Sequence, residues 1–73
     1  MRLYRVAKVH GAERKPFVLM TGDLTVPQPL QAIGTYDTKA EAVAAARLLA
    51  GWRHRVEWVD WRGRAYVISE GRP

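Results

Sequence analysis

The chain contains no cysteine. Because a disulfide or a thiolate metal site requires that residue, both are excluded, and a reducing compartment is expected. There is also no apolar run of about 18 residues, the length that spans a bilayer. Residues 1–5 lack the long apolar core of a signal peptide. These absences predict a cytoplasmic protein that makes no membrane contact.

Groups that carry catalysis are scarce as well. The two histidines, His10 and His54, have no carboxylate or second histidine at ligand spacing, and Ser69 is the only serine. No HExxH, glycine-rich phosphate loop or GxSxG motif occurs. Since an enzyme needs a nucleophile, an acid–base pair or a metal, we expect a non-enzymatic protein with no cofactor and no metal.

The chain has a high net positive charge for its length. Its 73 residues carry a net charge of +5, and 48% are hydrophobic. We expect one small domain over residues 1–73, since a chain of this size buries only about 60% of its unfolded surface. The charge favours acidic protein faces or polyanions as partners. We expect a monomer in the absence of a partner.

Residues 38–50 carry the clearest helix signal. Thr38 and Glu41 have the spacing of a capping box, in which each side chain satisfies a backbone N–H at the helix start. Alanine and leucine favour the helix body, and Gly51 can take the left-handed conformation that ends it. The apolar stripe predicted to pack on a sheet comprises Ala42, Ala46, Leu49 and Ala50, with Val43 and Ala45 at its edges.

The rest of the chain reads as strands. Residues 2–9 and 17–21 predict an antiparallel hairpin, and residues 56–61 and 64–69 predict another around a tight turn at Arg62–Gly63. The predicted fold class is therefore α+β, with the order strand-strand-helix-strand-strand. In this arrangement one helix packs on one face of an antiparallel sheet.

Two segments are predicted to lack regular structure. Residues 22–34 contain Pro27 and Pro29, which forbid a regular element across the middle, so we expect a loop. Its apolar side chains either pack over the core or stand exposed as a contact surface. Residues 70–73 are expected to form a frayed polar tail.

The candidate site is an aromatic and basic cluster between residues 52 and 64. Arginine pairs with carboxylates or phosphates, and tryptophan offers a flat stacking face. Strand alternation puts Trp58 and Trp61 on opposite faces, so one is expected in the core, while Trp61 either is exposed or covers the second hairpin. The predicted partner-binding residues are Trp52, Arg53, Arg55, Trp61, Arg62 and Arg64.

Such a cluster suits either a protein interface, where Trp and Arg dominate binding energy, or a single-stranded nucleic acid. No RNP1 pattern, GXXG loop or zinc-finger spacing is present. The helix carries only Lys39 and Arg47 as basic residues, which makes it a poor reader of a DNA groove. An acidic protein face is therefore the favoured partner, with nucleic acid as the alternative.

The arginine-rich opening at residues 1–6 and the hairpin at residues 58–64 lie on a short, cysteine-free, single-domain chain. In size and character the chain resembles the small basic proteins that lytic phages make to bind bacterial RNA polymerase. The resemblance implies binding to the N-terminal part of the beta-prime subunit in the host cytoplasm, inhibition of initiation through the sigma factor, and antitermination. The alternatives are a small basic nucleic-acid-binding domain and a phage inhibitor of another host machine, such as a defence nuclease.

Overall fold

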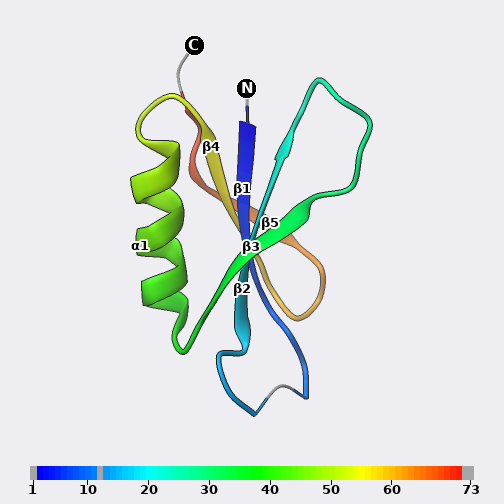
Figure 1. Cartoon of the computed structure of the whole chain (residues 1–73), viewed down its shortest axis with the longest axis vertical. Helices are drawn as coiled ribbons and strands as arrows, with labels where there is room; N and C mark the ends of the chain where they lie inside the picture. The colour runs from blue at the N-terminus through cyan, green and yellow to red at the C-terminus, as the bar shows by residue number, and fades with distance from the viewer. Residues whose placement is uncertain (1, 12, 72–73) are drawn as a thin grey trace.

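A computed structural model describes residues 2–11 and 13–71 (Figure 1). No helix in these ranges is long and apolar enough to cross a membrane. In chain order the elements are β1 (Arg2–Lys8), β2 (Phe17–Asp23), β3 (Gln31–Tyr36), α1 (Lys39–Ala50), β4 (Arg55–Val59) and β5 (Ala65–Ser69).

The five described strands form one sheet in the order β3-β2-β1-β4-β5, and α1 covers one face of it. β1 pairs with β4 in parallel, and the other neighbouring pairs are antiparallel. The α+β class with a single helix on one face is confirmed. The predicted antiparallel sheet is wrong in one pair, so the sheet is mixed.

The predicted loop over residues 22–34 is wrong at both ends. β2 continues to Asp23, and β3 begins at Gln31, two residues after Pro29. A proline restricts only its own position and the residue before it, so the chain regains extended geometry immediately afterwards. The irregular segment is residues 24–30, in which Leu30 is half-buried while Leu24 and Val26 are exposed.

The missed strand explains the parallel pair. β1, β2 and β3 alternate in direction, and α1 then runs back along the sheet before β4 begins (Figure 1). With three strands ahead of the helix, β4 takes the direction of β3 and therefore of β1. With only two strands ahead of the helix, β4 would have run antiparallel to β1. One omitted strand thus reversed the predicted pairing.

Both edge strands contain a β-bulge. In β3 the register passes from Gly34 to Ala32 opposite consecutive residues of β2, which leaves Ile33 unpaired. In β5 it passes from Ser69 to Val67 opposite β4, which leaves Ile68 unpaired. A bulge interrupts the regular ladder of hydrogen bonds, and natural proteins use this at exposed edges.

The helix begins after Thr38 and ends before Gly51, at the positions that the sequence predicts. The Oγ1 of Thr38 accepts the N–H of Glu41 at 3.1 Å. Gly51 donates its N–H to the carbonyl of Arg47 at 2.9 Å, and it has the expected positive φ, 59°, but its ψ of -142° lies outside the predicted left-handed helical region. At the other end of the chain, Gly71 packs so closely on the backbone of His54 that a Cβ would come within 2.6 Å of it. Arg72 and Pro73, in the predicted tail, lie outside the described residues.

The core lies between α1 and the three central strands. Val6, Leu19 and Val56 are fully buried and face Ala42, Ala46 and Ala50, while Val43 and Ala45 pack at the edges. Leu49 was predicted in this stripe but is 53% exposed. The buried alanines recur every four residues, so the stripe rotates by about 40° per step and has moved away from Leu49 at the last turn.

The close packing of the buried alanines of α1 on the sheet gives the first prediction. Ala46→Leu adds three carbons where the exposed fraction is 0%, so we expect overpacking to lower the free energy of unfolding by about 1–3 kcal/mol. Ala44→Leu, at an exposed position of the same helix, is the matched control. Urea denaturation followed by circular dichroism measures both, and equal midpoints would show that the alanine contact is not tight.

Candidate partner-binding surfaces

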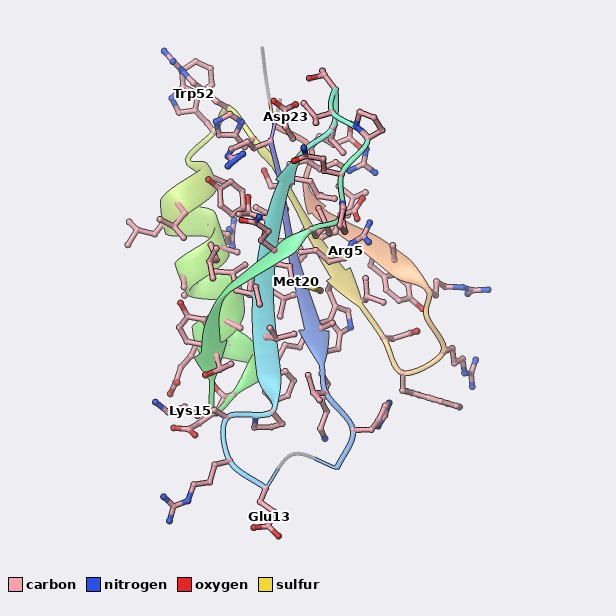
Figure 2. The ribbon with its side chains drawn as sticks, turned by 45° about the vertical axis from the view of Figure 1, so that its right-hand side comes forward. Arg5, Glu13, Lys15, Met20, Asp23 and Trp52 are labelled. Carbon is pink, nitrogen blue, oxygen red and sulfur yellow. The ribbon has the colours of Figure 1, made fainter. Side chains whose placement is uncertain are left out.

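The predicted aromatic and basic cluster is divided between the two ends of β4. Trp52 and Arg53 lie in the connection between α1 and β4 (Figure 2), whereas Trp61 and Arg62 lie in the turn between β4 and β5 (Figure 1). Trp52 is 63% exposed and Trp61 is 72% exposed. The sequence places these residues within ten positions of one another, but the extended strand separates them in space.

The ring of each exposed tryptophan is in contact with the guanidinium of the arginine that follows it in the chain. The Cζ of Arg53 lies 5.3 Å from the ring centroid of Trp52, and the Cζ of Arg62 lies 4.8 Å from that of Trp61. A guanidinium within about 6 Å of a ring centroid is attracted to its face. Each end of β4 therefore presents a compact pair that combines an apolar plate with a cation.

The turn that holds Trp61 is well braced. One carboxylate oxygen of Asp60 accepts the N–H groups of Arg62 and Arg64, both at 2.9 Å. Gly63 has a φ of 80° and donates its N–H to the carbonyl of Asp60. The Asp60 N–H also donates to the carbonyl of Arg64, so the loop comprises the three residues between them. Glycine's expected positive φ is confirmed.

These hydrogen bonds lower the pKa of the Asp60 carboxyl. The N–H of Arg64 lowers the pKa of the carboxyl most, and the N–H of Arg62 lowers it further. Hydrogen bonds from backbone donors favour the ionised form because that form accepts them best. The ionised carboxylate thus holds the turn, and Arg64 contributes its backbone to the loop rather than a stacked side chain.

Trp58 belongs to the interior, as expected for one of the tryptophans. It is half-buried and packs against the core, with its ring centroid 6.0 Å from that of Phe17. The Nζ of Lys39, at the start of α1, lies 4.3 Å from the Trp58 ring centroid. Trp61 is not buried in the same way, because β4 ends at Val59 and Trp61 lies in the turn that follows.

Sequence reasoning missed a charged cluster on the sheet face turned away from α1. Glu57 Oε1 accepts bonds from Arg5 Nη2 at 2.9 Å and Arg5 Nε at 3.2 Å. The Nε of Arg55 lies 2.8 Å from Glu57 Oε2, but its N–H is not aimed at that oxygen, so this contact is an ion pair without an aligned hydrogen bond. Figure 2 shows Arg5 on the side opposite the helix.

This cluster holds one buried carboxylate between two partly exposed guanidiniums. The side chain of Glu57 is 8% exposed, and those of Arg5 and Arg55 are 35% and 36% exposed. Arg55, predicted as a partner residue, is thus already engaged within the chain. Arg5 and Glu57 are 52 residues apart and meet only through the parallel register of β1 and β4, so no local signal indicates their contact.

The two histidines have different surroundings. His54 accepts the backbone N–H of Arg2 through its Nδ1 at 3.1 Å, and its ring centroid lies 6.1 Å from that of Tyr4. His10 is exposed in the connection between β1 and β2. Among residues 2–11 and 13–71, no group of three or more His, Asp or Glu side chains is arranged to hold a metal.

Comparisons with family models, curated proteins and solved structures found no match to the chain.

The buried carboxylate gives the second prediction. Glu57→Ala removes charge-assisted bonds and leaves two neighbouring guanidiniums without their anion. We expect the free energy of unfolding to fall by about 2 kcal/mol, below the cost for a fully buried pair because water reaches both arginines. Glu70→Ala, at an exposed position, is the control. Equal urea midpoints for the two variants would rule out a structural role for the cluster.

The turn gives the third prediction. The pKa of Asp60 in the folded chain lies below its ordinary value of 3.8. Its stabilising effect is therefore complete above that value and is lost as the pH falls through the lower, folded-state pKa. We expect the amide resonances of Arg62 and Arg64 to shift with a midpoint below 3.8. Asp60→Asn should abolish this transition, and a midpoint at or above the ordinary value would contradict the assignment.

Proposed function

We propose that the chain is a non-enzymatic protein-interaction module that binds through the turn containing Trp61 and Arg62. The observation that carries this proposal is a tryptophan 72% exposed on a turn held by four hydrogen bonds. Tryptophan and arginine are the side chains that most often dominate protein interfaces. Because the turn is already ordered, binding costs little conformational entropy there.

The partner proposed first is bacterial RNA polymerase, through its beta-prime subunit, on the strength of the resemblance to small phage regulators. The net charge of +5 suits an acidic protein face. A protein of this kind inhibits initiation and promotes antitermination by occupying a surface, since a ligand that binds one polymerase state more tightly shifts the population toward it. No cofactor enters this mechanism.

Nucleic-acid binding is the second candidate, and the stacked pairs Trp52–Arg53 and Trp61–Arg62 are what favour it. Each pair offers a stacking face beside a cation, as single-strand binding requires. Their location at opposite ends of β4 counts against one continuous track for a strand. A salt titration separates the candidates, because phosphate contacts on a single strand each add about 0.7 to the slope of log affinity against log salt.

The partner is tested by binding tagged chain to purified bacterial RNA polymerase, with nuclease-treated lysate capture as a first screen. We expect polymerase subunits to be retained after nuclease treatment and the purified enzyme to bind directly. Failure of the purified enzyme to bind would exclude this partner. Loss of all captured material after nuclease treatment would favour the nucleic-acid candidate.

The fourth prediction tests the turn itself. We expect Trp61→Ala and Arg62→Ala each to weaken polymerase binding by about tenfold or more, as hot-spot truncations do, without changing the urea midpoint. Leu48→Ala, 85% exposed on the outer side of α1, should leave binding unchanged. Trp52→Ala reports whether the opposite end contributes. If Trp61→Ala instead unfolds the domain, the side chain is structural and the assignment of the turn is wrong.

A further inference from the structure

Among the described residues, Leu30 of the connection between β2 and β3 covers one end of the sheet face turned away from α1. Residues that alternate with the core positions point to this face, and the Cδ2 of Leu30 lies 2.5 Å from the position that a Cβ on Gly22 would take. Beyond Leu30, Met20 and Val67 lie on either side of the Arg5–Glu57 pair in one row across the sheet, and the next row is apolar, with Val18, Ala7, Val59 and Ala65. Met20 and Val59 are half-buried, and Val67 is 42% exposed. This region, together with Arg5 and Arg55, is called the open face below.

The charge of the open face is positive and fixed in place. Arg5 and Arg55 flank the buried Glu57, and no other charged residue stands on the strand positions that face this side. A guanidinium has five N–H donors, and Glu57 takes two from Arg5. Both arginines therefore retain donors for a further anion, and Glu57 limits the side-chain freedom that binding would have to remove.

Three kinds of occupant fit poorly. A second copy would present an open face of the same net positive charge, which opposes face-to-face association. A nucleic acid would find no aromatic platform on the described strands, because their aromatic side chains belong to the helix side: Tyr4, Phe17, Tyr36 and Trp58 pack toward the core, and Tyr66 is paired with Trp58. An added strand would have to pair with β3 or β5, and the bulges at Ile33 and Ile68 interrupt both edges.

We propose that the open face binds an acidic amphipathic helix of a protein partner. The apolar stripe of that helix packs along the row that contains Val59, and its carboxylates pair with Arg5 in the neighbouring row and with Arg55. A helix on this side matches α1 on the other and completes a three-layer arrangement of the kind that buries both faces of a sheet. The inference rests on the proposed function, protein interaction, and supplies the chemistry of the partner.

Two synthetic peptides of about 16 residues test the chemistry, a length at which designed helices begin to be stable in water. They share one leucine stripe, and their flanking positions carry glutamate in one peptide and lysine in the other. We expect the glutamate peptide to bind the isotope-labelled chain about tenfold more tightly or better. The amide shifts should map to β2, β1, β4 and β5 around the open face.

Variants locate the site. Val67→Glu adds a repelling charge to the open face, and we expect it to weaken the glutamate peptide by about tenfold. Leu48→Glu makes a similar change on the outer side of α1 and should leave affinity unchanged. Both variants alter exposed side chains, so retention of the urea midpoint is expected and is measured first. If Val67→Glu unfolds the chain, Ala65→Glu replaces it, since Ala65 is exposed on the same face.

Several results would overturn the inference. Equal affinity for the two peptides, shifts confined to the Trp61 turn, or tighter binding of an oligonucleotide to the open face would each do so. Polymerase binding that survives Val67→Glu while the peptides fail to bind would leave the proposed function standing and remove the open face from it. Peptide binding as expected, with no binding of polymerase, would support the open face and assign it to another acidic partner.

Discussion

The parallel pairing of β1 with β4 is the constraint on which the rest of the molecule depends. It joins the two antiparallel parts of the sheet, and it is reached only because α1 carries the chain back across β2 and β1. The buried alanines allow this crossing at close range by packing on Val6, Leu19 and Val56. The same register sets Arg5 beside Glu57, so the core on one face and the charged cluster on the other share a single origin.

Local signals predicted the parts of the fold that local chemistry determines. Thr38 and Gly51 end the helix through bonds to neighbours a few positions away, and Gly63 takes the positive φ that its turn requires. β3 was missed because two prolines precede it, although they restrict only the loop before the strand. That omission reversed the direction of β4, which shows how one missed strand can alter a topology when the parity of elements decides it.

The candidate site likewise has features that the local sequence predicted and features that depend on the sheet topology. The composition of residues 52–64 indicated a surface rich in tryptophan and arginine, and Trp52 and Trp61 are exposed. Their separation could not be read from spacing, because it follows from β4 being extended between them. Glu57 pairs with a residue 52 positions away, and such a contact exists only once the sheet order is known. The partner itself stays a prediction from resemblance.

The interruptions at Ile33 and Ile68 have a consequence for the chain at high concentration. A sheet whose two outer strands kept an unbroken ladder would template further copies at both margins and could grow into fibrils. In this sheet a β-bulge interrupts the hydrogen-bond ladder of each edge strand, β3 and β5. At high concentration the chain is thereby hindered from polymerising with itself, so more of it remains free to diffuse.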